Sequence, residues 1–116
     1  MRQQSIQEIY VNETLFVERR FALDDQDLVA QCFLPYKAPT GEFQCQWSVA
    51  WPDRVATGAA CGEDGVQALM LALQSIGIEL YNSEEYKAGR ITLWLQSDLD
   101  LPPAWGAGRL YTGPHT

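Results

Sequence analysis

The sequence predicts an α+β fold, in which an antiparallel sheet of 4–5 strands (β-β-β-β-α-β) is covered on one face by one main helix. Two patterns predict this class. Apolar residues recur at every second position in three successive segments before residue 52, as in half-buried strands. Between residues 63 and 81 they recur at steps of three and four, as on one face of a helix. At 116 residues the chain has the length of a single domain.

The three alternating strands cover residues 14–23, 28–36 and 43–51, and a short fourth strand is expected over 54–60. Their expected inward residues are Leu15, Val17, Phe21, Leu23, Leu28, Ala30, Cys32, Leu34, Phe43, Cys45, Trp47, Val49 and Trp51. Hairpins that close at Asp24–Asp27 and at Tyr36–Gly41 pair Leu23 with Leu28 and Cys32 with Cys45. The inward residues of all three strands then share one buried face.

The helix presents Val66, Leu69, Leu73, Ile76 and Leu80 as its apolar stripe. Glu63 and Asp64 fall in its first turn, where carboxylates meet the positive end of the helix dipole. A last strand follows, with Ile91, Leu93 and Leu95 directed inward. Residues 1–11 and about 97–116 show no regular pattern, and we expect these ends of the single domain 1–116 to be loosely structured.

The charge balance excludes several classes of partner. Eight basic and fifteen acidic residues give a net charge of −7, which repels nucleic acid. No apolar run is long enough to span a membrane, so we expect a cytoplasmic protein. Cys32, Cys45 and Cys61 match no metal or redox spacing. We expect no metal and no cofactor, and buried free thiols, with a disulfide between Cys32 and Cys45 as the less favoured alternative.

No set of residues indicates catalysis. The single histidine, His115, is the penultimate residue, and no serine lies in a nucleophile elbow. Carboxylates gather at Asp24–Asp27 and at Asp98–Asp100, where Asp residues commonly stabilise turns. An enzyme that uses these carboxylates is one functional hypothesis, and it is less favoured than a protein-binding module or a homo-oligomeric subunit.

Arg19 is the one charged residue on the inward side of the first strand. A guanidinium there must pair with an acid or reach solvent. We expect a structural ion pair with Asp64 or Glu63 at the start of the helix. In the alternative, Arg19 extends past the helix into solvent.

Aromatic side chains on outward positions indicate a surface for a partner. Trp94 on the last strand and Phe16 and Phe33 on the first two strands point away from the helix in the expected register. One helix cannot cover both faces of a sheet, so either the tail around Trp105 covers this second face or another protein binds it. Trp94, Phe16, Phe33 and Trp105 are therefore the candidate partner-binding residues.

The chain also resembles a family of short bacterial proteins that is classed as a domain of unknown function. The family pattern is a strand with an Arg, a strand that ends in Pro, a Cys-x-Trp strand, and a helix that opens Gly-x-Asp-x-x-Gln-Ala-Leu. The matching residues are Arg19, Pro35, Cys45, Trp47, Gly62, Asp64, Gln67, Ala68 and Leu69. The resemblance covers about residues 13–95 and implies no enzyme activity.

Small size, acidity, the missing catalytic set and the exposed aromatic residues together favour a small acidic protein-binding module. An immunity or inhibitor protein that neutralises a basic partner protein would have these properties. The first alternative is a homo-oligomeric structural or regulatory subunit, and the oligomeric state is left open between monomer and homodimer.

Overall fold

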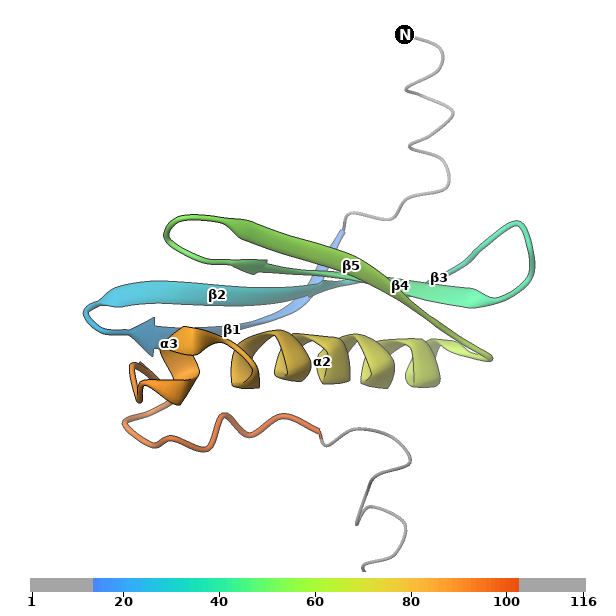
Figure 1. Ribbon diagram of the computed structural model, residues 1–116. Coiled ribbons are helices and arrows are strands. Elements are labelled where there is room, and N and C mark those ends of the chain that lie inside the picture. The colour runs from blue at the N-terminus through green and yellow to red at the C-terminus, as the bar shows by residue number, and fades with distance from the viewer. Residues whose placement is uncertain (1–13, 103–116) are drawn as a thin grey trace, which may run out of the picture.

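The computed structural model describes residues 14–102 and confirms the α+β class. One layer is an antiparallel sheet and the other is the main helix, α2 (Gly65–Tyr81), as Figure 1 shows. The strands are β1 (Leu15–Leu23), β2 (Gln26–Phe33), β3 (Tyr36–Lys37), β4 (Phe43–Ala50), β5 (Val55–Gly62) and β6 (Ile91–Thr92), and a short helix α3 (Glu84–Lys87) precedes β6. Across the sheet the order is β6, β1, β2, β4 and β5, with the short β3 paired to β4 beyond the end of β2.

Both predicted hairpin registers are wrong by two residues. Leu23 pairs with Gln26, because the first turn uses only Asp24 and Asp25 and Asp24 takes a positive φ of 57°. Cys32 pairs with Trp47 instead of Cys45, since the chain breaks after Phe33 and then pairs Tyr36 with Gln44. A slip of two residues preserves the side-chain alternation of a strand. The centre of the predicted buried face therefore survives at Phe21, Leu28, Cys32 and Val49. The prediction is wrong at its edge, where Leu15, Val17 and Leu34 are 40–48% exposed.

Helix α2 begins one residue after its cap. Asp64 accepts a hydrogen bond from the backbone N–H of Gln67 at 2.8 Å, which satisfies one of the free donors at the helix start. The buried side of α2 carries Ala68, Ala72, Ile76 and Leu80, whereas Val66 of the predicted stripe is 71% exposed and Leu69 and Leu73 are only half-buried. Alanines at the first two of these positions let the helix approach the sheet closely. The helix packs about equally on β4 and β5 and only slightly on β2.

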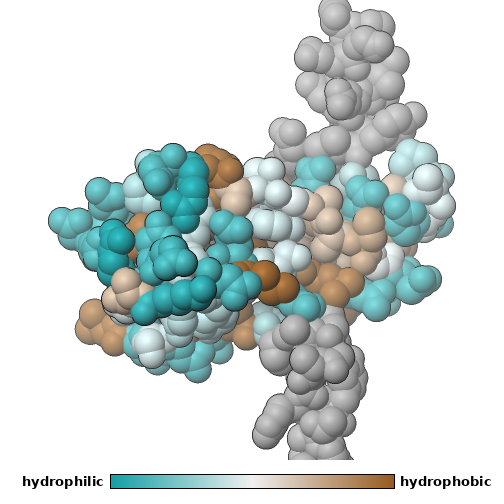
Figure 2. All heavy atoms as spheres, viewed as in Figure 1, coloured by the Kyte–Doolittle hydropathy of each residue, from teal (hydrophilic) through white to brown (hydrophobic). Residues whose placement is uncertain are grey.

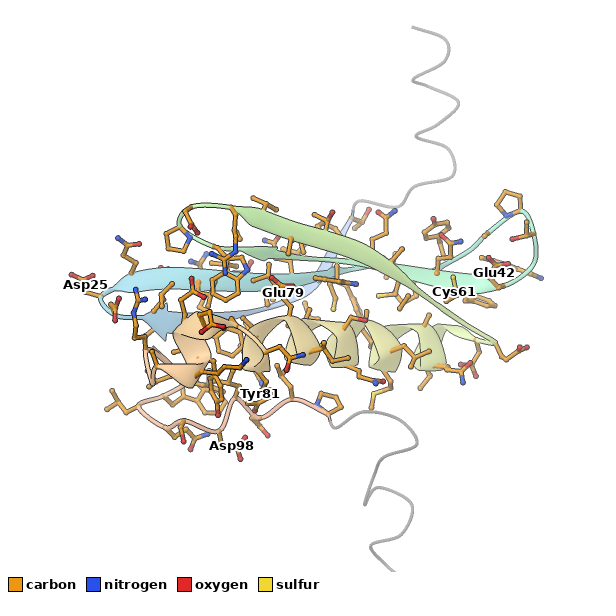
Figure 3. The ribbon with its side chains drawn as sticks, viewed as in Figure 1. Asp25, Glu42, Cys61, Glu79, Tyr81 and Asp98 are labelled. Atoms are coloured by element: carbon orange, nitrogen blue, oxygen red, sulfur yellow. The ribbon has the colours of Figure 1, made fainter. Side chains whose placement is uncertain are left out.

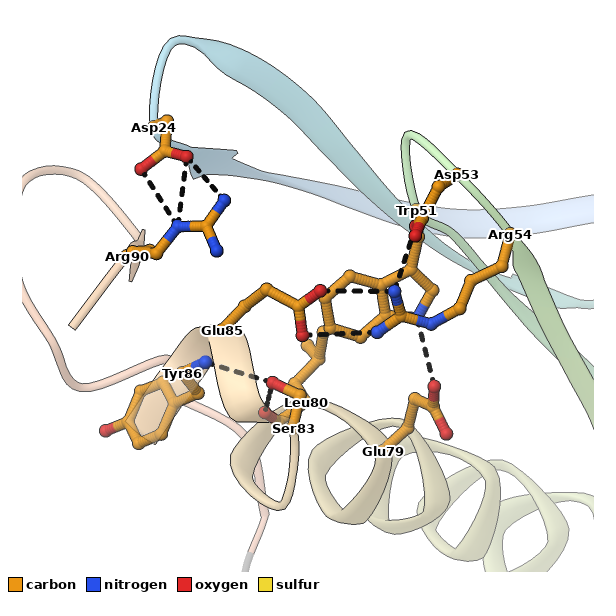
Figure 4. Close-up of polar contacts among 10 residues, drawn as sticks. All are labelled: Asp24, Trp51, Asp53, Arg54, Glu79, Leu80, Ser83, Glu85, Tyr86 and Arg90. Atoms are coloured by element: carbon orange, nitrogen blue, oxygen red, sulfur yellow. Dashed lines mark hydrogen bonds and ion pairs between the residues drawn. The ribbon is translucent and has the colours of Figure 1, made fainter. Parts of the chain in front are cut away.

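A polar cluster joins the β4–β5 turn to the end of α2 (Figure 4). The indole N–H of the buried Trp51 donates to Glu79 at 3.0 Å, and the guanidinium of Arg54 lies 4.0 Å from the centroid of the indole ring. Arg54 also binds both carboxylate oxygens of Glu85, at 3.1 and 3.2 Å. Through this cluster the far end of the hairpin is fixed to both helices.

The β1–β2 turn is tied to the strand that follows α3. The carboxylate of Asp24 accepts hydrogen bonds from Arg90, the shortest at 2.7 Å, and the Asp24 N–H donates to the Arg90 carbonyl (Figure 4). The hydrogen bond from Arg90 lowers the pKa of Asp24 below its usual value. A depressed carboxylate pKa contributes stability above the unfolded pKa of about 3.9, and this stability is lost as the pH falls through the folded pKa.

We therefore expect Asp24→Asn to destabilise the protein at pH 7. The deficit should shrink as the pH falls below about 4 and vanish once the pH is below the folded pKa of Asp24. Asn tolerates the positive φ at this position, so the substitution tests the charge rather than the turn. Urea unfolding of both proteins between pH 2 and 7 measures the difference. Asp25→Asn is the matched control, because the structure shows no ion pair for Asp25 within residues 14–102. A deficit that stays constant across this pH range would contradict the prediction.

The last predicted strand is only partly formed. β6 contains Ile91 and Thr92, and the chain then turns at Trp94 and Leu95. The alternation predicts that Leu95 points inward, but this residue is 96% exposed, whereas Ile91 and Leu93 are buried as expected. The segment from Ser97 to Pro102, expected to be loosely structured, has no regular secondary structure, yet Leu99 is fully buried. Within residues 14–102 the structure has no helix that is long and apolar enough to cross a membrane.

Candidate partner-binding site

The site begins with the short connection between α2 and β6. Ser83 caps α3, accepting a hydrogen bond from the Tyr86 N–H at 3.0 Å and donating to the Leu80 carbonyl at 2.7 Å. Tyr86 packs edge-on against Tyr81, with ring centroids 4.8 Å apart. Its hydroxyl donates to the Ser97 carbonyl at 2.9 Å. This arrangement ties Ser97, near the end of the loop between β6 and Leu99, to α3.

At the end of that loop two large apolar residues form what we call the apolar tip, Trp94 and Leu95. Leu93 and Gln96 exchange two backbone hydrogen bonds of 2.9 Å around them, so the tip is a two-residue hairpin turn. Both tip residues have positive φ values, 52° and 70°, as in a type I′ turn, where Asn and Gly are strongly preferred. Trp94 is 70% exposed and Leu95 is 96% exposed.

Arg19 holds this region against the sheet. Its guanidinium donates from Nη1 to the carbonyls of Leu99 at 3.1 Å and Asp100 at 2.7 Å. Nη2 lies 4.0 Å from the Asp100 carboxylate, and the guanidinium stands 5.4 Å from the ring centroid of Trp94. The Leu99 N–H in turn donates to the hydroxyl of Tyr81 at 2.9 Å. Residues from β1, from α2 and from the segment after the tip therefore converge here.

The expected pairing of Arg19 with Asp64 or Glu63 is wrong. Asp64 caps α2, and within residues 14–102 the carboxylate that pairs with Arg19 is that of Asp100. The reason lies in the layout of the sheet. The helix packs on β4 and β5, which leaves the inner side of β1 to the segment from Leu99 to Pro102.

The remaining predicted site residues lie apart from Trp94. Phe33 alternates with the buried Cys32 and faces the open side of the sheet, next to Gln46 and Ser48. Phe16 lies at a bulge in β1 and is 46% exposed. Trp94 instead lies near Arg19 on the helix side, so the predicted patch does not form one surface. Trp105 lies outside the described residues.

The surroundings of the tip are acidic. Asp98 and Asp100 are both exposed and follow it directly in the chain. Gln96 donates its side-chain amide to the Asp98 carbonyl at 3.0 Å, and Asp98 accepts from the Asp100 N–H at 2.9 Å. Burial, with Asp98 nearby, raises the pKa of Tyr81 above its usual value, so this hydroxyl stays protonated at neutral pH. The tip therefore combines apolar side chains with a negatively charged rim.

An apolar cleft of about 260 Å³ adjoins this region between β1, β2, α2 and the segment after the tip. Phe21, Ile76 and Leu101 line its walls, and Arg19 and Asp100 lie at its polar border. The Arg19 charge is already balanced by Asp100 and by two carbonyls. The cleft therefore offers apolar contact without an unbalanced charge.

The other groups considered for chemistry do not assemble into a site in the described part of the chain. Asp25 lies at the β1–β2 turn and Asp98 beside α2, well separated in Figure 3. Asp24 and Asp27 are paired with Arg90 and Arg20. No group of three or more His, Cys, Asp or Glu residues within residues 14–102 could hold a metal ion.

The free thiols of Cys32 and Cys45 belong to the core, whereas Cys61, also expected to be buried, is exposed. Both side chains are buried, and Cys45 donates to the Phe33 carbonyl at 3.2 Å. The adjacent Cys45 and burial together raise the pKa of the Cys32 thiol well above its usual value. Cys32 is therefore a protonated core side chain rather than a nucleophile.

Sequence reasoning missed Leu95, Asp98 and Asp100 as parts of the site. The segment Leu93-Trp94-Leu95-Gln96 contains no Gly, Asn or Pro, and its alternation favours a strand over a turn. On the face seen in Figure 2, apolar groups reach the surface in small separate patches among polar ones. A surface residue such as Leu95 therefore has to be judged from its backbone and exposure.

Comparison with known proteins identifies one relationship. A family model described as "Domain of unknown function (DUF6968)" matches residues 17–103. No curated protein and no solved structure matches the chain.

Proposed function

The chain belongs to the DUF6968 family, and we propose that it is a small protein-binding module that inserts its apolar tip, Trp94 and Leu95, into a partner protein. The observation that carries this proposal is the exposure of both side chains on a backbone that disfavours them. Trp is enriched among the few residues that dominate the energy of protein interfaces. An exposed, fixed Trp next to an exposed Leu is suited to that role.

The backbone of the tip supports the same function. Positive φ values are uncommon for bulky residues, and each residue held in such a region costs on the order of 1–3 kcal/mol. The backbone hydrogen bonds between Leu93 and Gln96 and the guanidinium of Arg19 beside the Trp94 ring maintain this arrangement. Because the side chains gain little burial within the free chain, the strain is compensated in a complex, where the two residues enter an apolar pocket.

Charge defines the partner further. The rim of Asp98 and Asp100 and the net charge of −7 favour a protein with basic residues around that apolar pocket. An acidic inhibitor or an immunity protein that neutralises a basic toxin would work in this way, and we propose the cytoplasm as its place of action. Opposite charges would also accelerate the encounter at low salt.

The double substitution Trp94→Asn/Leu95→Gly separates binding from folding. Asn-Gly is the preferred pair for a type I′ turn, so we expect the variant to be more stable than the wild type by about 1–2 kcal/mol. At the same time it should lose the partner, with an affinity at least roughly 30-fold weaker, because an interface Trp commonly contributes about 2 kcal/mol or more. Thermal unfolding measures the first effect. Capture from the native host, followed by titration with the purified partner, measures the second.

Val66→Asn is the matched control, because Val66 is 71% exposed but lies on α2. It should retain the partner. If the tip variant binds as tightly as the wild type, or if the tip variant and the wild type retain the same set of host proteins, the apolar tip is not the binding element.

A further inference from the structure

The free edge of β5 is the least protected edge of the sheet. β5 pairs with β4 along all eight of its residues, and within residues 14–102 it has no second neighbour. The Trp51 N–H donates to the Arg54 carbonyl at 2.8 Å, which sets the alternation of the ladder. From this alternation, the N–H and C=O groups of Val55, Thr57, Ala59 and Cys61 point away from β4. All four residues are exposed.

The two edges of the sheet differ in charge. At the opposite edge of the sheet, β1 carries Glu18 and Arg20, which form an ion pair of 3.3 Å. Charged side chains on an edge strand discourage pairing with another chain. β5 contains no charged residue and no proline in its eight residues, Val55–Gly62. One edge is therefore protected by charge and the other is open.

Helix α2 shows the same lack of charge next to the β5 edge. Of its seventeen residues only Glu79 is charged, and Glu79 binds the Trp51 indole. A helix with one face in solvent normally carries charged residues on that face. Gly77 lies on the flank of α2 that faces Leu101. Ser75 is two residues earlier and therefore lies on the opposite flank, together with Leu71, which precedes it by one turn. This uncharged flank points toward the side of β5.

We propose that two copies of this chain associate by antiparallel pairing of their β5 edges, so that the two sheets become continuous and the two α2 helices lie side by side. An antiparallel strand edge is its own complement about a two-fold axis, which makes a second copy a suitable occupant. No charge on β5 opposes this approach, although each chain has a net charge of −7.

The spacing of the layers fits this pairing. Since α2 packs about equally on β4 and β5, it lies over the boundary between them. In the pair, the corresponding boundary of the second copy lies two strand spacings away, which is about 9.6 Å. Packed helices are separated by about 8–10 Å, so the two α2 helices would meet in direct contact. Leu71 and Ser75 would lie at that contact.

The contact is large enough for a specific dimer. Eight paired residues extend over about 27 Å, and a sheet layer with a helix layer is roughly 20 Å deep. The contact then covers on the order of 500 Å² per copy, or about 1,000 Å² in total, which is the lower limit for specific interfaces. The apolar tips, near the β1 edge, remain free in this arrangement, so the dimer does not depend on the proposed function.

Sedimentation analysis of the full chain tests the proposal. We expect a species of twice the chain mass of 13.0 kDa that dissociates on dilution. Thr57→Pro removes an N–H that points away from β4, a position where an edge strand tolerates proline. Ala59→Lys adds a charge at the same edge. Both variants should sediment as folded monomers, with dimer affinity reduced at least tenfold and circular dichroism unchanged.

Gln46→Lys is the matched control, because Gln46 pairs with Ala59 but lies on β4, whose two edges are occupied. It places the same charge on the same open face and should remain dimeric. A wild-type chain that stays monomeric throughout, or a dimer that persists in both edge variants, would overturn the proposal. Equal dissociation of the control would also overturn it, because the effect would then come from charge alone. If Thr57→Pro fails to fold, Ala59→Lys decides between these outcomes.

Discussion

Replacing Trp51 with alanine should lower the free energy of unfolding by about 3–5 kcal/mol, the range for deletion of a large buried aromatic side chain. Trp51 is only 4% exposed and packs in the main core cluster. Its loss also leaves Glu79 without its indole donor and Arg54 without the ring beneath its guanidinium. The β4–β5 turn would then lose its hydrogen bond to α2, and its connection to α3 would depend on the Arg54–Glu85 pair alone. Urea unfolding followed by circular dichroism measures the change.

Trp51→Phe separates the ring from its polar contacts. Phenylalanine keeps most of the apolar contact but cannot donate to Glu79, so we expect a loss of about 1–2 kcal/mol. Glu79→Gln in the wild-type background keeps an acceptor for the indole and should have a smaller effect. Equal losses for Trp51→Ala and Trp51→Phe would show that the hydrogen bond, and not the buried ring, provides most of the stability that Trp51 contributes.

The buried face of the sheet could be predicted because side-chain alternation in a strand has period two. Phe21, Leu28, Cys32 and Val49 are buried as that pattern predicts. The pairing partners could not be predicted, because a slip of two residues preserves this alternation. The actual register depends on the tight turn at Asp24 and on the break after Phe33. These are features of backbone conformation that residue types indicate only weakly.

Trp94 of the candidate site could be predicted as an exposed aromatic residue, but the turn that carries it together with Leu95 could not, for a different reason. Alternation places Trp94 on a strand, and the turn that exposes it uses residues that disfavour turns. The same alternation correctly places Arg19 on the inward side of β1, but it does not identify the partner of Arg19. That partner depends on which strands the helix covers, and the apolar stripe of α2 does not specify them. Functional and strained sites are where local sequence preference and the fold are expected to disagree.

The proposed contacts occupy opposite edges of one sheet. β5 lies at one side, and β1 with the apolar tip lies at the other. A dimer formed through β5 would therefore present two apolar tips at its outer ends. Such an assembly could bind two copies of a partner, and a bivalent partner would be held more tightly than by either tip alone. Ala59→Lys should remove this gain while it leaves the affinity of one tip unchanged.

Replacing Arg19 with methionine should cost about 2 kcal/mol, because it removes two hydrogen bonds donated by a charged group while keeping the apolar stem. The carbonyls of Leu99 and Asp100 lose their donor, and Trp94 loses the cation beside its ring. The segment after the tip should open locally. The Leu99 N–H, which donates to the Tyr81 hydroxyl in the wild type, should then exchange faster with solvent.

Arg20→Met is the matched control for this substitution. Arg20 is the next residue of β1 and faces the other side. Within residues 14–102 it forms surface ion pairs with Glu18 and Asp27 and no others. Pairs of that kind contribute about 0–1 kcal/mol. A double-mutant cycle should give coupling between Arg19 and Asp100 and none between Arg19 and Asp64. The role of Arg19 as the residue that fixes the tip to the sheet requires contacts with the segment from Leu99 to Asp100. Equal losses of unfolding free energy for Arg19→Met and Arg20→Met, or coupling of Arg19 with Asp64 alone, would contradict that role.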